Sequence, residues 1–343
     1  MKKIKFLSML FAFVFSIGFL SCSNDDDDDN GGSIPVAPNG TINPGLVNGR
    51  YLTGVGKANI EYDETGRVAS FTDNGYYNEG WDDDGSKYIV SYNPFEIAFT
   101  DGENNIKVSG VTFTKEGYIK SIKMVRADSE CTEKETWNLT YDDGYLTKID
   151  ATGDFTENYG GESYSGKYKG KLDIKWNNGN MDKVQITTIS SENGYTSTDT
   201  TSYVFSYGNE ENIHRQPTPA QALDFNEHVE ILVYLGYFGK AGSLLPKTLE
   251  CRNTWIEDDY HTVFTQRNSY DYSMNSDGML KVVYNEIEQK ETTYNEVGEI
   301  AYQYDDVYDE QIEYRYDKDA PAPMESKAVK RSKKSNRRGF LSR

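Results

Sequence analysis

Few residues of this 343-residue chain have the types and spacing that catalysis or metal binding requires. The three histidines, His214, His228 and His261, are far apart in the sequence and lack the spacing of metal ligands. The chain contains no Gly-x-Ser-x-Gly elbow, phosphate loop or dinucleotide fingerprint. With 55 acidic residues, a carboxylate pair of the kind used by glycosidases is easy to find and therefore uninformative. The sequence thus predicts no catalytic residue, no metal ligand and no cofactor.

The residues around Cys22 predict a covalent modification of this cysteine. Lysines and an apolar run from Phe6 to Leu20 precede it, as in a secretory signal. That run is shorter than the roughly 20 apolar residues that span a bilayer. Because Phe19-Leu20-Ser21-Cys22 resembles a lipobox, we expect residues 1–21 to be cleaved and Cys22 to carry lipid. The alternative is ordinary signal cleavage that leaves Cys22 as a spare thiol.

A tether over residues 22–45 follows this cysteine. It begins with the acidic block Asp25–Asp29, which must stay solvated, and continues with Gly, Pro, Asn and Ser. The block is either a spacer or a signal similar to the acidic surface-export signal of Bacteroidetes lipoproteins. On the second interpretation the protein is anchored in the outer membrane by its lipid and exposed at the cell surface.

The remaining cysteines, Cys131 and Cys251, leave two alternatives open. In an extracytoplasmic domain they could form a disulfide, which would close a long loop and stabilise the fold by roughly 4–5 kcal/mol. Equally, both could be buried free thiols, because spacing alone does not show proximity.

Charge excludes one class of partner. Of the 36 Lys and Arg residues, three lie in residues 1–21 and eight in residues 325–343, whereas only one of the 55 acidic residues lies in either segment. Residues 22–324 therefore carry a net charge of about −29, which should repel nucleic acid and anionic membranes. The basic tail, residues 321–343, is predicted to be disordered; it is either a solvated tail or a contact with anionic polymer or with the protein's own acidic face.

Alternation of apolar and polar residues predicts the fold class. Half-buried antiparallel strands have this period of two, because successive side chains point to opposite faces. We interpret residues 46–320 as a single β-rich domain. The predicted faces are Trp137, Leu139 and Tyr141; Leu172, Ile174 and Trp176; Tyr203, Phe205 and Tyr207; Ile300, Tyr302 and Tyr304; and Ile312, Tyr314 and Tyr316.

The predicted turns between these strands are similar to one another. An aromatic residue is followed by polar residues, a Gly and an apolar residue, as in Tyr62-Asp63-Glu64-Thr65-Gly66 and Tyr141-Asp142-Asp143-Gly144. Gly supplies the positive φ of a tight hairpin, so the chain should be a meander of hairpins. Single hairpins are marginally stable, so we expect one large sheet that curls toward a barrel.

One segment, about residues 219–235, breaks the pattern and predicts a helix. Thr218 and Gln221 form a capping box around Pro219, and Gly236 ends the helix. The apolar residues Ala222, Phe225, Val229 and Leu232 fall on one face. We expect this amphipathic helix to plug or cap an open end of the sheet; the alternative is a partner-binding helix.

Together, the Tyr-Asp-x-x-Gly hairpins, the helix through Leu232–Gly236 and the Leu245-Pro246-Lys247 exit resemble a Bacteroidetes surface lipoprotein family of unknown function, whose domain is described as porin-like in fold. The resemblance covers roughly residues 48–318. It implies an antiparallel barrel-like fold and brings no catalytic residues. A literal transmembrane barrel is disfavoured, since many predicted strands carry charge on one face and Tyr on the other.

Aromatic residues beside glycine in predicted loops are the candidate ligand-binding residues: Tyr76, Tyr77, Trp81 and Tyr195. Such rings can stack on sugar faces or anchor a protein partner, or they can simply cover loop backbone. The nearby Asp82-Asp83-Asp84-Gly85 has oxygen ligands but not the spacing of an EF-hand, so we interpret it as a solvated turn rather than a calcium site. We therefore expect a non-enzymatic module that binds glycan or envelope protein, with a structural role in an envelope complex and a glycan-acting hydrolase as alternatives. No oligomeric state is predicted.

Overall fold

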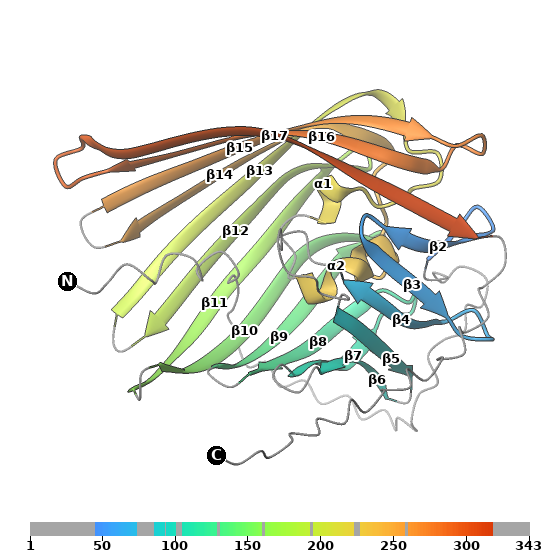
Figure 1. Cartoon of the computed structure of the whole chain (residues 1–343), viewed down its shortest axis with the longest axis horizontal. Helices are drawn as coiled ribbons and strands as arrows, with labels where there is room; N and C mark the ends of the chain where they lie inside the picture. Colours follow the sequence, from blue (N-terminus) through green and yellow to red (C-terminus); the bar gives the residue numbers. More distant parts are fainter. Residues whose placement is uncertain are drawn as a thin grey trace, which may run out of the picture.

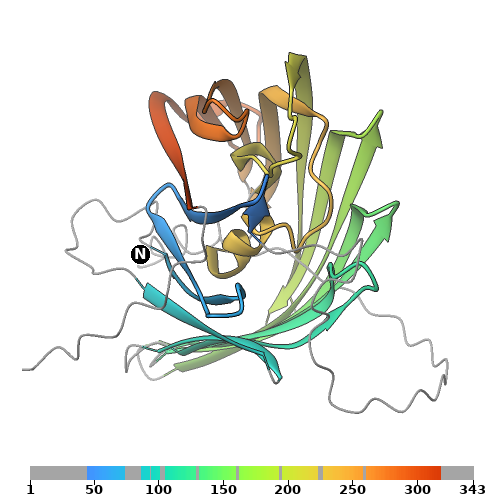
Figure 2. The same ribbon diagram turned by 90° about the vertical axis from the view of Figure 1, so that its right-hand side faces the viewer.

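The chain folds into a closed antiparallel β-barrel with a plug inside one end (Figures 1 and 2). The computed structural model describes residues 45–73, 86–92, 94–100, 105–128, 131–159, 162–192, 195–222, 227–257 and 260–317. Within these ranges, strands β2 to β17 pair in chain order, and β17 closes the barrel on β2. The short β1 pairs with β2. The predicted fold class, an all-β meander curled into a barrel, is confirmed.

The strands are β1 (Leu46–Val47), β2 (Arg50–Val55), β3 (Ala58–Tyr62), β4 (Val68–Asp73), β5 (Ser86–Tyr92), β6 (Phe95–Thr100), β7 (Asn105–Phe113), β8 (Ile119–Ala127), β9 (Cys131–Asp142), β10 (Tyr145–Tyr159), β11 (Glu162–Asn177), β12 (Asn180–Glu192), β13 (Tyr195–Glu211), β14 (Leu244–Glu257), β15 (Tyr260–Met274), β16 (Leu280–Tyr294) and β17 (Ile300–Asp317). The first six are short and the last nine are long, so the wall is tall on one side and low on the other (Figure 1).

The turns at the plug end form as the repeated pattern predicts. Asp143-Gly144 and Asn178-Gly179 have positive φ at both residues, the geometry of a two-residue type I′ hairpin turn. In the longer turns a side chain caps the backbone: Asp63 Oδ1 accepts hydrogen bonds from the amides of Thr65 and Arg67 (2.8 and 3.0 Å). Local chemistry therefore fixes where each hairpin reverses.

Six aromatic residues near the ends of strands, among them Tyr62 and Tyr141 of the repeated pattern, have a second role that the pattern alone does not reveal. Each donates a hydrogen bond to a backbone carbonyl near the start of the preceding strand, and these bonds form a belt around the plug end. The pairs are Tyr62–Leu52, Tyr92–Val68, Tyr141–Ile119, Trp176–Leu146, Tyr207–Met181 and Tyr272–Pro246, at 2.6–2.8 Å. These five tyrosines and Trp176 therefore have a structural role.

The predicted helix is present as two short pieces, α1 (Pro219–Ala222) and α2 (Glu227–Tyr234). Gln221 Oε1 accepts from the Thr218 amide (3.1 Å), which is one half of the predicted capping box. The helix ends at Gly236, where the Gly236 and Tyr237 amides donate to Val233 and Leu232 in a Schellman motif.

We call residues 212–222 and 227–243 the plug. Its backbone bonds to barrel turns: the amides of Lys240 and Ser243 donate to the carbonyls of Gly144 and Gly179 (2.8 and 3.1 Å). Each residue from Val229 to Leu235 except Glu230 is buried. The prediction that only one face of the helix is buried is therefore wrong. A helix that lies inside a barrel contacts the barrel wall on every side (Figure 2). The predicted position, plugging one end, is confirmed.

β17 departs from the predicted half-buried pattern. Ile312 and Tyr314 are buried, but Ile300, Tyr302 and Tyr304 are exposed. The reason is that β17 runs past the short strands next to it, so that its first half has a neighbour only in β16. We call this end of the barrel, away from the plug, the mouth.

Candidate functional site

The interior face of β15–β17 changes character in three tiers from the plug to the mouth. Next to the plug, Tyr272, Val283 and Ile312 lie in register and belong to the core. At the mouth, Thr293 faces the exposed Tyr302. Between these tiers the inward-facing residues include four amides and three carboxyl groups, so the wall becomes polar where it leaves the core.

The four central amides, Gln266, Asn268, Asn285 and Gln289, form a connected network that we call the amide ladder. Gln289 donates to Gln266 (2.9 Å), Gln266 to Asn268 (2.8 Å) and Asn268 to Asn285 (3.2 Å). The ladder ends at Tyr308, which accepts from Gln289 (3.2 Å), and at Glu310, which accepts from Asn285 (3.3 Å). Asn268 and Asn285 are buried, whereas Gln266 and Gln289 are only half-buried. The ladder therefore has a fixed inner part and an accessible outer part.

A second polar group lies on the opposite wall, on β9, with six strands between it and β16. Glu133 accepts a hydrogen bond from Tyr168 (2.8 Å), and Glu135 lies two residues away on the same face. Both carboxyls are buried. Burial raises the pKa of Glu135 to about 8. A hydrogen bond from Trp137 opposes this shift, and the charge of Glu133 adds to it. Burial also raises the pKa of Glu133.

Glycines let aromatic rings lie flat on this wall. A Cβ at Gly153 would be 2.1 Å from Cζ of Tyr168, and one at Gly166 would be 2.4 Å from Cζ of Phe155. The two rings therefore cover cross-strand glycines, with Gly153 opposite Tyr168 and Gly166 opposite Phe155. A bulkier residue at either glycine would push the ring away from the wall.

Two buried polar atoms of the wall have no hydrogen-bond partner among the described residues: Thr188 Oγ1 and Asn253 Oδ1. Register places Thr188 opposite Asp199 and Asn253 opposite Phe264, on strands that lie between the two polar groups. Burial raises the pKa of Asp199. Unsatisfied buried atoms are rare in native proteins and mark a place for a water or a ligand group.

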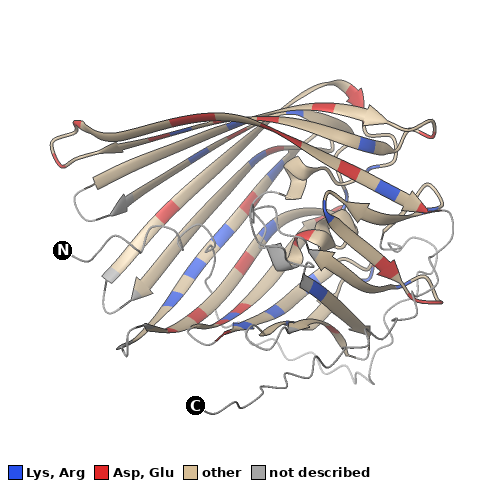
Figure 3. Ribbon diagram, in the orientation of Figure 1, with Lys and Arg blue, Asp and Glu red and all other residues tan. Residues whose placement is uncertain are grey.

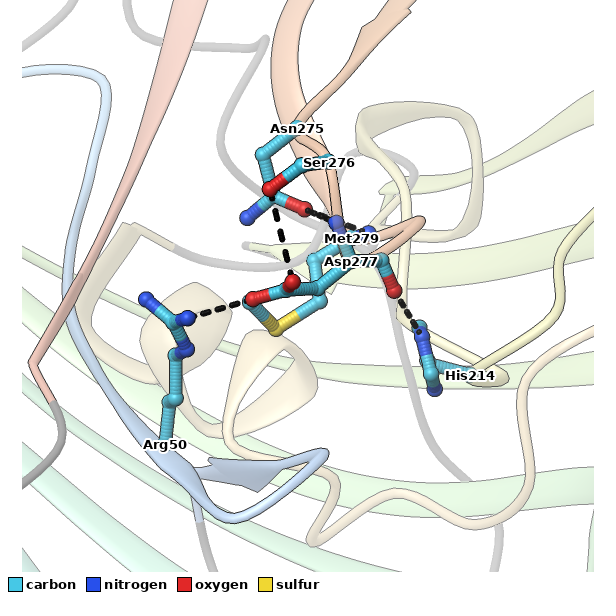
Figure 4. A network of polar contacts seen from close by, with 6 residues as sticks. All are labelled: Arg50, His214, Asn275, Ser276, Asp277 and Met279. Carbon is cyan, nitrogen blue, oxygen red and sulfur yellow. Dashed lines mark hydrogen bonds and ion pairs between the residues drawn. The ribbon is translucent and has the colours of Figure 1, made fainter.

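A separate polar network holds the plug end together (Figure 4). Arg50, at the start of β2, forms an ion pair with Asp277 in the β15–β16 turn. The Asp277 carbonyl also contacts Nε2 of His214 in the plug (2.7 Å), and Asn275 Oδ1 accepts from the amides of Asp277 and Met279. The Ser276 hydroxyl contacts the Asp277 carboxylate (3.4 Å), whereas His214 contacts the backbone carbonyl of Asp277. The contacts of this network link the plug to two walls of the barrel, which is a structural role.

A small cavity lies inside the described part of the barrel. It measures about 30 Å³ and lies between the plug and β10–β12, next to Trp176, Val233 and Phe238. A space of this size holds about one water molecule. We therefore place the candidate site on the interior wall and not in this cavity.

The residues that the sequence singled out are mostly not in these groups. Tyr76, Tyr77, Trp81 and Cys22 lie outside the described residues, and Tyr195 begins β13 with its side chain outside them. Cys131 lies on β9 and Cys251 on β14, and no disulfide joins them.

Two of the three histidines can be placed. His214 lies in the plug network, His261 is exposed on β15, and the side chain of His228 is outside the described residues. No cluster of three or more potential metal ligands occurs in the described ranges. No helix in the same ranges is long and apolar enough to span a membrane.

Sequence reasoning missed the amide ladder. Gln266 and Asn268 share one face of β15, and Asn285 and Gln289 share one face of β16. This parity is visible in the sequence, but amides are common at exposed positions as well. Only the closure of the barrel shows that these four point inward.

The description of a matching protein family agrees with this fold. The family described as "Domain of unknown function (DUF4595) with porin-like fold" matches residues 60–283. A crystal structure of a porin-like protein from Bacteroides uniformis is similar with a TM-score of 0.42 and 14% identity, covering 76% of this chain and 90% of that one. A porin-like protein from Bacteroides vulgatus is similar with a TM-score of 0.43 and 13% identity, covering 78% and 99%. No curated protein sequence matches the chain.

Proposed function

The chain belongs to the family of domains of unknown function with a porin-like fold, and on that premise we propose that its barrel is a non-enzymatic binding module for a glycan. The amide ladder is the observation that carries this proposal. Amides both donate and accept hydrogen bonds, as a ligand with many hydroxyls requires. Gln266 and Gln289 are half-buried and therefore accessible, while the buried Asn268 and Asn285 hold them in place.

Aromatic residues beside the ladder support the same class of ligand. Tyr304 lies on the inward face of β17, opposite Glu291, and its side chain is 44% exposed. Tyr308 contacts the ladder directly through Gln289. Aromatic rings that flank polar groups provide stacking surfaces for sugar rings. The combination favours a sugar over a purely apolar ligand.

We propose further that the barrel stands in water outside the cytoplasm, attached through lipid on Cys22 to the outer membrane. The outer face of β11 carries the exposed residues Lys167, Lys169, Lys171 and Lys175, and charged residues recur along the other strands (Figure 3). A barrel that spans a membrane has instead an apolar outer band about 25 Å tall. A lipid anchor would hold such a charged barrel at the membrane without inserting it.

A glycan-acting hydrolase is the second candidate, and Glu133 and Glu135 are the observation that favours it. Two neighbouring carboxyls can serve as a general acid and a general base. Against it, both carboxyls are buried, and Tyr168 already binds Glu133. We therefore favour binding without catalysis.

A glycan array on the full chain, followed by calorimetry on any ligand found, tests the proposal. We expect Gln289→Ala and Tyr304→Ala to weaken binding at least about tenfold, or about 1.4 kcal/mol. Tyr284→Ala is the matched control, because Tyr284 is 47% exposed on the outer face of the neighbouring strand. Equal effects of Tyr304→Ala and Tyr284→Ala would place the ligand elsewhere. Release of sugars that Glu135→Gln abolishes would establish the hydrolase instead.

A further inference from the structure

β17 has an edge that the barrel uses only in part. β2 pairs with its last four residues, Tyr314–Asp317, and no other described strand pairs with this edge before them. Figure 1 shows β17 crossing the top of the barrel and meeting β2 only at its right-hand end. The seam between β17 and the short strands is thus closed next to the plug but not toward the mouth.

The closed part ends at a defined point. The Gly56 amide donates to the carbonyl of Glu313 (2.8 Å), and the Arg315 guanidinium donates to the carbonyls of Gly56 and Ala58. These contacts satisfy the backbone of the β2–β3 turn where it separates from β17. Further along, the Val307 amide donates to its neighbour Asp306 (2.9 Å). Among the described residues of this edge before Glu313, Asp305, Val307, Asp309 and Gln311 are exposed.

This edge is acidic on both faces. Asp305, Asp309 and Glu313 face outward, and Asp306 and Glu310 face inward, with no Lys or Arg from Ile300 to Glu313. Exposed apolar side chains alternate with them, including Val307 (63% exposed) and Tyr302 (53%). An unpaired strand edge is a template for another strand, and acidic charge deters two copies of this edge from pairing with each other. The same charge attracts a basic strand.

We propose that this edge binds the chain's own basic C-terminal segment, Lys327–Arg338, as an added antiparallel strand. That segment has twelve residues, as many as Ile300–Gln311. Its basic residues fall at both odd positions (327, 331, 333 and 337) and even positions (330, 334 and 338), so each face of an added strand would meet the acidic residues of β17. Opposite charges on directly paired residues stabilise a sheet.

The connection is long enough. Nine residues separate Asp317 from Lys327, and an extended chain covers roughly 3.3 Å per residue, or about 30 Å. The segment must pass only the four residues of β17 that pair with β2, about 13 Å. The proposal does not depend on the ligand of the barrel.

Hydrogen exchange of the full chain, purified in detergent, tests it. The amide hydrogens of Ile300–Gln311 should exchange about tenfold faster in a tail variant than in the unmodified chain. This variant carries Lys330→Gln, Arg331→Gln, Lys333→Gln and Lys334→Gln. The matched control removes four outward charges elsewhere: Lys167→Gln/Lys169→Gln/Lys171→Gln/Lys175→Gln should leave these amides unchanged. High salt should act like the tail variant.

A charge swap separates pairing from a general loss of stability. Reversing the four tail charges to Glu should remove the protection, and adding Asp305→Lys and Asp309→Lys should restore it. Equal exchange in the unmodified chain and the tail variant would overturn the proposal. Protection that depends on protein concentration, with a dimer in light scattering, would also overturn it, because the strand would then come from a second copy.

Discussion

At the scale of single residues, Glu135 shows how the interior wall departs from an ordinary core. Its carboxyl is buried beside Glu133, and burial raises its pKa to about 8, so near neutral pH it remains largely protonated. A protonated carboxyl donates a hydrogen bond, which an ionised one cannot do. Glu135 therefore behaves at neutral pH as a neutral polar group, in keeping with the amides across the barrel.

This pKa shift predicts a pH dependence of stability. The folded pKa lies above the ordinary value of 4.5, so the stabilising contribution of Glu135 is complete below that value and is lost as the pH rises toward 8. Glu135→Gln removes the ionisation but keeps the shape. We expect it to raise the melting temperature relative to the unmodified protein at pH 8.5 but not at pH 5. An equal shift in melting temperature at both pH values would show that the ionisation of Glu135 is not coupled to folding.

The thiols give a second prediction at this scale. Cys131 and Cys251 lie on β9 and β14, with four strands between them. At about 4.8 Å per strand, the path along the wall is roughly 24 Å, whereas a disulfide needs Cα atoms within about 7 Å. Titration of the denatured, unreduced protein should therefore find both thiols free. Burial also raises the pKa of Cys131 to about 11, so in the folded protein at pH 8 it should react slowly with iodoacetamide.

At the scale of elements, local chemistry made the strands and turns predictable. Alternation identified the buried faces of β9, β11 and β13, and the aromatic-polar-Gly pattern located hairpin turns such as Asp143-Gly144. The helix stop at Gly236 was also predictable from its residue type. Each of these depends on residues close in sequence.

Contacts between distant residues were not predictable. The carbonyl that each belt residue binds lies on the preceding strand, 10 to 30 residues earlier in the chain. The direction of the amide ladder depends on closure between β17 and β2. The exposure of Tyr302 follows from the shortness of β2–β6, which are far from it in sequence. The candidate site consists of such contacts, so its residues differ from those that the sequence singled out.

The plug provides the prediction at this scale. Leu232 is 1% exposed within the core, and truncating a buried leucine to alanine usually costs about 2–5 kcal/mol. Leu232→Ala should lower the melting temperature clearly. Ile213→Ala is the matched control, because Ile213 belongs to the plug but is 65% exposed, so its effect should be below about 0.5 kcal/mol. Small, equal effects in denaturant unfolding would mean that the plug contributes little to the fold.

At the scale of the whole molecule, the barrel combines a closed end with a polar interior. The tyrosine belt and the plug fill the end where the hairpin turns lie, and the interior becomes polar toward the mouth. The charged outer wall, exemplified by Lys169 and Lys171, is unsuited to lipid contact. These features support the proposed binding module and the proposed lipid attachment to a membrane.

Cys22 is the proposed attachment, and its removal gives the last prediction. Cys22→Ala should abolish incorporation of radiolabelled palmitate and move the protein from the membrane to the soluble fraction, because the charged wall provides no other hold on lipid. The melting temperature should not change, since the barrel begins at Leu46. Cys131→Ala serves as the control and should keep the label. Undiminished labelling of Cys22→Ala would exclude this lipidation site. A variant that lost the label but stayed in the membrane would show that the barrel itself contacts lipid or a membrane protein.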